Sequence, residues 1–252
     1  MKRAALAIFL SLFAAANPFA EEIDGAAFFK TARESMKFSR DGAQINIKRA
    51  SVVPAKGLCV SVPDGEMLSI AFSNKTSMLA VGPAEFKIEA FIQGSAENSP
   101  DDNLDRESAP SNISLSLKNG RFLFSLAQRL GSSKFTVKFP NAESEIQSGI
   151  AIAETGTNGS RLIPLDGFAR IKPQDSIWEI VKDGVSAVVP AKESDKKIIF
   201  NHVYSRERER FGNFIKTAEQ LRRSVIFKYS PNAGFAAELI LPKAFFAMPI
   251  KH

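Results

Sequence analysis

Cysteine and histidine are nearly absent from this sequence of 252 residues, which contains one cysteine, Cys59, and two histidines, His202 and His252. A single cysteine excludes an intramolecular disulfide. No HxH, HExxH or CxxC spacing occurs, so we expect no metal site and no cofactor. His202 is the only internal histidine that could activate a serine, and no GxSxG motif is present. Catalysis by a serine with a lysine as its base remains an alternative at Ser194, but we expect a protein that is not an enzyme.

Tryptophan and tyrosine are also scarce, with one Trp and two Tyr beside 21 Phe. Sugar-binding surfaces favour Trp and Tyr, whose rings join an apolar face to a polar group. The abundance of Phe instead favours a packed core and apolar protein interfaces. A polysaccharide-binding or polysaccharide-active protein is the alternative, because the separation of a catalytic carboxylate pair is a property of the fold. This alternative predicts a cleft with converging carboxylates, or exposed aromatic side chains around Trp178.

Long apolar runs are confined to the N-terminus. The basic start Met1-Lys2-Arg3 precedes thirteen almost wholly apolar residues and then a region of small residues. The run is too short to span a bilayer, and this order of segments is typical of a secretory signal peptide over residues 1–20. Cleavage after Ala16 or after Ala20 fits the small residues there. We expect an exported, soluble protein, periplasmic or extracellular, with no transmembrane segment in its mature form.

Acidic residues are fewer than basic ones, and the formal net charge of the chain is +6. Residues 1–20 contribute two basic residues and no acid, so the mature chain has 31 basic and 27 acidic residues and a net charge of +4. This excess is small, and an exported protein rarely meets nucleic acid. We expect no nucleic-acid partner.

Tight-turn dipeptides recur between short runs of alternating apolar and polar residues. The runs on either side of Asn119-Gly120, Asp166-Gly167 and Asp183-Gly184 predict three β-hairpins, because these dipeptides supply the positive φ angles of such turns. Ser73-Asn74-Lys75-Thr76 predicts a further hairpin corner. Gly82-Pro83 predicts an interruption of the ladder that follows.

The remaining alternating runs predict strands over residues 45–53, 66–72, 77–82, 85–92, 134–139, 149–154 and 196–203. Around the hairpin corner, the side chains expected to face the core are Leu68, Ile70, Phe72, Phe86 and Ile88. Many short strands with regularly spaced turns indicate a mainly β fold, either an antiparallel two-layer sandwich or an elongated twisted sheet.

Two segments have helical periodicity. Residues 205–227 predict a C-terminal amphipathic helix whose apolar stripe docks on the sheet. The stripe consists of Phe211, Phe214, Ile215, Ala218, Leu221 and Val225. A shorter N-terminal helix is predicted from Ala26 to about Lys37, with Phe29, Ala32 and Met36 on one face.

Two charged segments are candidates for contact with a partner. The first is the start of the C-terminal helix, and its candidate residues are Arg206, Arg208 and Arg210. The second is the segment 94–112, which has no periodicity, two prolines and five acids against one arginine, and is predicted to be a long solvated loop. Its candidate residues are Asp101, Asp102 and Asp105. Solvated surface is the simpler interpretation of both, and the helix could alternatively contact an anionic polymer or membrane surface.

Several strand and turn markers occur in an order that is typical of a known family of domains. They are Phe72-Ser73-Asn74 with Thr76, Phe91-Ile92-Gln93, Leu117-Lys-Asn-Gly120, Ser133-Lys-Phe-Thr-Val137 before Pro140, Gly149, and Leu165-Asp166-Gly167. Over roughly residues 57–172 this order resembles the FecR domain, an all-β extracytoplasmic module. The sequence departs from the family at Lys75, where glycine is common, and at Ile150, where threonine usually follows the glycine.

The resemblance also implies a role and a domain organisation. In its best-understood setting the FecR domain belongs to membrane-spanning anti-sigma regulators, which receive a signal from the periplasmic domain of an outer-membrane receptor. This chain resembles instead the stand-alone exported members, so we expect an interaction, signalling or structural module whose partner is a cell-envelope protein. The expected parts are a signal peptide (1–20), a helical segment (21–43), a FecR-like β domain (44–200) and a helix with a strand extension (201–252).

Overall fold

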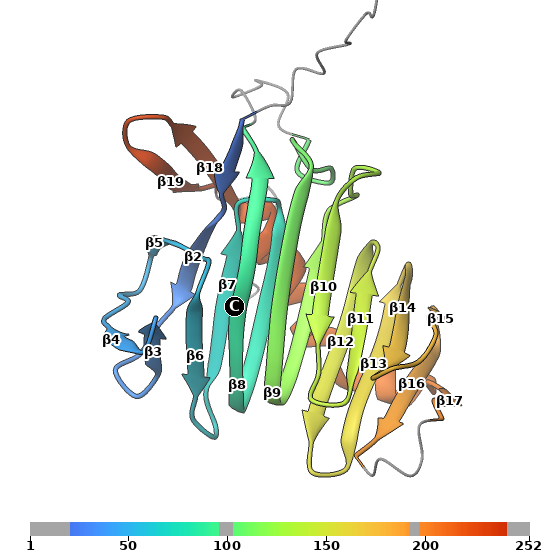
Figure 1. Ribbon diagram of the computed structural model, residues 1–252. Helices are drawn as coiled ribbons and strands as arrows, with labels where there is room; N and C mark the ends of the chain where they lie inside the picture. The colour runs from blue at the N-terminus through green and yellow to red at the C-terminus, as the bar shows by residue number, and fades with distance from the viewer. Residues whose placement is uncertain (1–20, 96–102, 192–196, 241–252) are drawn as a thin grey trace, which may run out of the picture.

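The computed structural model describes residues 21–95, 103–191 and 197–240. In these residues the protein is mainly β, as the sequence predicts, and its helices α1 (Ser205–Arg210) and α2 (Gly212–Ser224) follow the main strands (Figure 1). Within the described ranges, neither helix has the length and the apolar character that crossing a bilayer requires.

Strands β1 to β17 form one hydrogen-bonded network around its two longest members, β8 (Thr76–Gly94) and β9 (Ser111–Leu126). Sheet I contains the first half of β8 and the second half of β9. Its order is β5 (Ser51–Pro54), β2 (Ala26–Thr31), β7 (Met67–Phe72), β8, β9, β12 (Gly149–Gly156), β13 (Gly159–Asp166), β16 (Val185–Pro190) and β17 (Ile199–His202).

Sheet II contains the other halves of the two long strands. Its order is β4 (Ala43–Ile45), β3 (Lys37–Arg40), β6 (Leu58–Val62), β8, β9, β10 (Lys134–Lys138), β11 (Ala142–Ile146), β14 (Phe168–Pro173) and β15 (Glu179–Lys182), and β1 (Glu22–Asp24) pairs with the end of β8. The pairing of β9 with β10 is parallel, and the other ladders named here are antiparallel.

The ladder between the two long strands is interrupted near its middle. β8 continues through Gly82-Pro83, but its register against β9 shifts between Val81 and Glu85. β9 continues through Asn119-Gly120 without reversing, so the hairpin predicted there is wrong. Gly120 has a φ of 113°, and a Cβ on it would lie 2.5 Å from the Cβ of Ala84. This glycine therefore permits a close approach of two strands. Glycine within a strand can serve this purpose instead of forming a turn.

The other two predicted hairpins are also wrong, although the chain does turn at both places. β13 and β14 pair with different neighbours, so Asp166-Gly167 carries the chain from sheet I to sheet II. Asp183-Gly184 carries it back from β15 to β16. The predicted corner at Ser73–Thr76 is confirmed, because Phe72 pairs with Thr76 and Lys75 has a φ of 58°.

The main core lies between the two sheets. It includes all five side chains predicted to be buried around the first corner, Leu68, Ile70, Phe72, Phe86 and Ile88. Phe86 of β8 and Phe122 of β9 meet edge to face with ring centroids 5.7 Å apart. Such a pair adds about 0.5–1.5 kcal/mol to the stabilisation that comes from burial alone.

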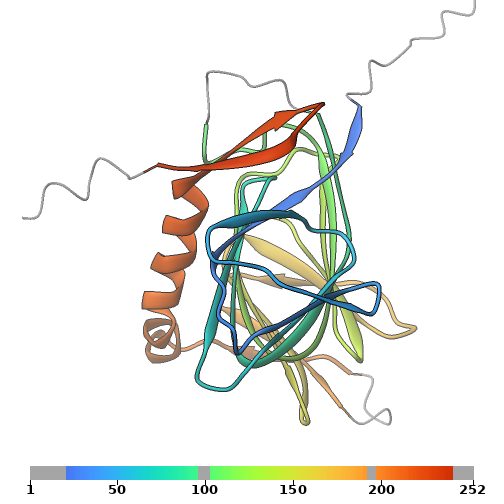
Figure 2. The ribbon, with the colours of Figure 1, turned by 90° about the vertical axis from the view of Figure 1, so that its left-hand side faces the viewer.

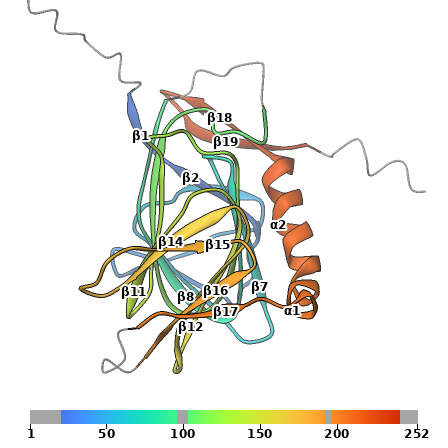
Figure 3. The same ribbon diagram turned by 90° about the vertical axis from the view of Figure 1, so that its right-hand side faces the viewer.

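Helix α2 covers the outer face of sheet I (Figures 2 and 3). Ala218 and Leu221 are fully buried in a second core that includes Leu79 and Leu123 of the sheet. The Ser77 hydroxyl donates a hydrogen bond of 2.7 Å to the carbonyl oxygen of Ala218. The predicted docking of the apolar stripe is thus confirmed.

The C-terminal helical segment is shorter than the sequence predicts. It is divided at Phe211, and α2 ends at Ser224. Residues 225–230 form strand β18 (Val225–Ser230), which pairs with β19 (Gly234–Leu239) as a separate hairpin.

The predicted N-terminal helix is wrong, because residues 26–31 form β2 and residues 37–40 form β3. Phe29 belongs to the main core, whereas Phe28 belongs to the second core beneath α2. A strand covered on both faces buries consecutive apolar residues, so it loses the alternation by which strands are recognised.

Candidate interaction site

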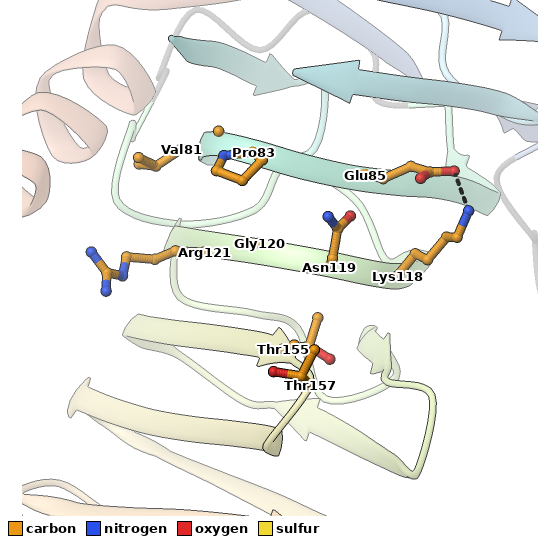
Figure 4. Close-up of a pocket in the computed structure, with 11 residues that line it drawn as sticks. Val81, Pro83, Glu85, Lys118, Asn119, Gly120, Arg121, Thr155 and Thr157 are labelled. Carbon is orange, nitrogen blue, oxygen red and sulfur yellow. Dashed lines mark hydrogen bonds and ion pairs between the residues drawn. The ribbon is translucent and has the colours of Figure 1, made fainter. Parts of the chain in front are cut away.

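A groove lies where the ladder between β8 and β9 is interrupted (Figure 4). It has a volume of about 740 Å³, and its walls come from β8, β9 and the turn between β12 and β13. Glu85 accepts a hydrogen bond of 3.0 Å from the Lys118 ammonium across it. The side-chain oxygen of Asn119 is buried without a hydrogen-bond partner. The accessible carboxylate of the groove therefore already has a cationic partner, and its one unpaired acceptor is buried.

A second hollow of about 430 Å³ continues from the groove past Gly120 and Arg121. Its carboxylate, Glu154, lies 2.5 Å from Arg121 and 3.5 Å from Arg161. Arg161 also donates a hydrogen bond of 2.5 Å to Glu207 of α1. Burial disfavours the charged form of Arg161, but these carboxylates outweigh it and raise its pKa. The hydrogen bond from Arg161 in turn lowers the pKa of Glu207. The charges of this hollow are therefore engaged in ion pairs.

Trp178 lies half-exposed between β14 and β15, and it lines neither hollow. The Arg170 guanidinium and the Lys172 ammonium each lie 4.7 Å from the centre of its ring. These cations also pair with Glu145 at 2.6 Å and with Glu143 at 3.1 Å. The indole is thus already in contact with two cations.

β15 ends sheet II and β17 ends sheet I, and both strands lie at the same end of the molecule (Figure 3). Large apolar side chains are exposed at this end. Of the seven exposed large apolar side chains in the described chain, six belong to this end of the molecule. We name these six residues the open edge: Phe168, Ile177, Ile180, Ile199, Phe200 and Tyr204. Ile180 is 65% exposed and Tyr204 is 76% exposed. Exposed large apolar side chains grouped at one end of a molecule mark candidate sites for protein partners.

The main chain of β17 has a free side. Within the described strands, β17 pairs only with β16. The Val203 N–H donates a hydrogen bond of 2.9 Å to the Gly184 carbonyl oxygen, and the β16–β17 register continues this ladder. Bonded and non-bonded pairs alternate in an antiparallel ladder, so Asn201 also points its main-chain groups toward β16. Phe200 and His202 therefore point their N–H and C=O groups away from the sheet.

Helix α1 places basic residues beside the open edge. Arg206 and Arg210 are exposed, as the sequence analysis expects of contact residues. Arg208 is engaged within the protein, because it donates to the Leu165 carbonyl oxygen and pairs with Asp183 at 3.1 Å. All three candidate arginines thus lie at the surface, but Arg208 also holds α1 against the sheets.

Asp105 of the 94–112 segment contacts α2 and not the open edge. Asp105 accepts hydrogen bonds from Arg222 at 2.7 Å and from Arg223 at 3.1 Å. The Arg222 side chain is 5% exposed and also donates to the carbonyl oxygen of Leu104. The hydrogen bond from Arg222 lowers the pKa of Asp105. Asp105 thus fastens its segment to α2, while Asp101 and Asp102 lie outside the described residues.

Sequence reasoning missed the open edge as a candidate site. Ile180 and Phe200 were assigned to predicted strands, because alternating apolar residues indicate a strand. The alternation does not indicate whether another element covers that strand. The one available signal was Tyr204, an aromatic residue between the last strand of the sheet and a charged helix.

Comparison with known proteins adds little to this description. No family model matches the sequence, and no curated protein matches it. Among the solved structures that align with it are two that are both described as a "putative anti-sigma factor from Parabacteroides distasonis ATCC 8503". The first has 12% identity and a TM-score of 0.43, and the alignment covers 61% of this chain and 63% of that one. The second has 11% identity and a TM-score of 0.40, with 60% and 62% covered. The chain thus spans less than two thirds of either structure.

Proposed function

We propose that this chain is an exported, non-enzymatic module of the cell envelope that binds a protein partner through the open edge. The observation that carries the proposal is that six of the seven large apolar side chains exposed in the described residues lie in or beside β14, β15 and β17. Burying one such side chain stabilises a complex by about 1.5–3 kcal/mol. A partner that covers several of them gains part of this free energy from each, and that gain offsets the cost of association.

Two sequence features support the rest of the proposal. The basic start and apolar run of residues 1–20 support export. The FecR-like markers over residues 57–172 support a signalling or structural role outside the cytoplasm, in an antiparallel two-layer sandwich. Determination of the N-terminal residue of the mature protein tests export, and Asn17 or Glu21 is expected.

The proposed docking surface is tested with a photoreactive benzoylphenylalanine at position 180. The matched control has the same residue at Lys37, which is exposed on β3 near the opposite end of sheet II. Illumination of intact cells at native abundance should give a discrete adduct from position 180 and none from position 37. Recovery of free monomer from both positions would contradict the proposal.

A charge at the open edge tests the same surface without a cross-linker. Ile180→Glu should abolish adduct formation from a photoreactive residue at position 200. Because Ile180 is 65% exposed, its substitution should change the free energy of unfolding by no more than about 0.5 kcal/mol. An adduct that persists in this stable variant would show that the partner does not bind through Ile180.

Polysaccharide binding is the second candidate, and the half-exposed Trp178 is the observation that favours it. The indole ring could stack on a sugar only if Arg170 or Lys172 moved away from the ring face that the sugar would occupy. Trp178→Ala should then release the protein from isolated envelope polysaccharide, whereas Ile180→Glu should not. Equal retention of both variants and the unmodified protein would remove this candidate.

A further inference from the structure

Strand β17 can accept another strand. The main-chain groups of Phe200 and His202 point away from β16, and both residues are exposed. An extended segment placed alongside β17 would satisfy these donors and acceptors and extend sheet I, which is how exposed sheet edges recognise peptides. Unpaired edges of this kind otherwise promote aggregation, so proteins that keep them in solution usually protect them.

The side chains of this edge offer one apolar contact on each face of sheet I. Phe200 pairs with Ala187, a fully buried member of the main core, so it points to the same side of sheet I, toward the space between the sheets. Ile199 pairs with Val188 and points to the opposite side. Alternate residues of an added strand would therefore cover Phe200 on one side and Ile199 on the other.

The charges around this edge indicate an acidic partner. Lys182 and Arg206 are exposed and make no ion pair within the described chain. Both lie near the Gly184 turn, which the Val203 N–H ties to the end of β17. Arg210 is exposed on the same helix, where Glu209 is the exposed acid. Asp183, an exposed acid of the same turn, is already paired with Arg208. The unpaired cations at this corner therefore outnumber the unpaired acids, and an acidic segment is favoured over a basic one.

A lipid surface is the competing occupant of an apolar and basic corner. Insertion into lipid would place the free N–H and C=O groups of Phe200 and His202 where nothing satisfies them, at a large cost. A strand satisfies them instead. We propose that β17 takes up an extended acidic segment of the partner protein as an additional strand of sheet I. This inference rests on the proposed function and names the chemistry of the partner.

The test uses two pools of synthetic nine-residue peptides with the mature protein. Both pools alternate Val, Ile or Leu with polar residues, which are Glu, Asp and Thr in one pool and Lys, Arg and Thr in the other. The acidic pool should slow amide hydrogen exchange at Phe200 and His202 at least tenfold, because these N–H groups become bonded. Equal protection by both pools, or none by either, would overturn the proposal.

Proline substitution separates main-chain pairing from side-chain contact. His202→Pro removes an N–H that faces away from the sheet, a position where an edge strand tolerates proline. It should weaken binding of the acidic pool at least tenfold, whereas His202→Ala, which keeps the N–H, should bind normally. Should His202→Pro fail to fold, the double variant Lys182→Glu and Arg206→Glu replaces it, and its preference should change to the basic pool. If folded His202→Pro, or the folded double variant, binds the acidic pool as well as the unmodified protein does, the proposal is overturned.

Two further outcomes separate this inference from the proposed function. A photo-adduct from position 180 together with peptide binding that is insensitive to His202→Pro would retain the protein partner and reject strand addition. Co-sedimentation with phosphatidylglycerol vesicles but not with phosphatidylcholine vesicles, without peptide binding, would identify a lipid surface and reject the acidic strand.

Discussion

Replacement of Gly120 by alanine should destabilise the protein through two separable effects. Gly120 has a φ of 113°, so any side chain there is strained. An added Cβ would also lie 2.5 Å from the Cβ of Ala84 and 2.7 Å from its Cα, closer than nonbonded carbons approach. Strain at positive φ costs about 1–2 kcal/mol, and overpacking of a close contact costs about 1–3 kcal/mol. Their sum for Gly120→Ala is about 2–5 kcal/mol.

Gly65 provides the matched control. It has a φ of 73°, but nothing lies within 4 Å of the position of an added Cβ. Gly65→Ala should therefore be destabilised by backbone strain alone, without overpacking. In a chain of this size 1 kcal/mol corresponds to about 2–4 °C in Tm, so thermal unfolding of Gly120→Ala should occur about 2–12 °C below that of Gly65→Ala. Equal Tm values would refute the close approach of β8 and β9 as the reason for a glycine at position 120.

The remaining predictions concern the two helices and their ion pairs. Leu221→Ala should lower the free energy of unfolding by about 2–5 kcal/mol, measured by urea titration, whereas Leu239→Ala, half-exposed on β19, should change it by less than about 0.5 kcal/mol. The pKa values of Asp105 and Glu207 are lowered by Arg222 and Arg161 in the folded state. The stability they contribute is present above their unfolded pKa values of about 4 and is lost as pH falls through the lower folded values. The urea midpoint should therefore fall between pH 6 and pH 3. The urea midpoint of the double variant Asp105→Asn and Glu207→Gln should fall less steeply over this pH range. If its pH dependence equals that of the unmodified protein, these two ion pairs do not contribute the expected stability.

The sequence predicts local features of this fold better than it predicts strand pairing. The corner at Ser73–Thr76 and the core positions on either side follow from turn chemistry and alternation, and both are confirmed. The turns at Asp166-Gly167 and Asp183-Gly184 are real, but they connect different sheets. Turn residues determine that the chain reverses, whereas long-range packing determines which strands become neighbours.

The helix predicted from Ala26 fails for a related reason. β2 is buried by the main core on one face and by α2 on the other, so Phe28 and Phe29 are both inside. The helix that covers β2 begins at Gly212, which is 186 residues after Ala26. The sequence around β2 therefore does not indicate that a helix covers this strand.

The candidate contact residues show the same limit. Exposure of Arg206 and Arg210 could be predicted, because a helix that docks by one stripe leaves its charged face in water. The engagement of Asp105 by Arg222 could not, since the two residues are 117 positions apart in the sequence. Pairings over that distance are set by the fold and not by neighbouring residues.

Because β8 and β9 are members of both sheets, neither sheet can separate from the other while its own ladders stay intact. The region from β1 to β17 therefore has no internal boundary along which one half could unfold alone, and it should lose its structure in a single cooperative step. Amide groups as far apart as β5 and β13 would then share one opening reaction, whereas the separate β18–β19 hairpin would exchange earlier. A partner bound at β17 would consequently stabilise the whole region against unfolding and not merely the strand it contacts.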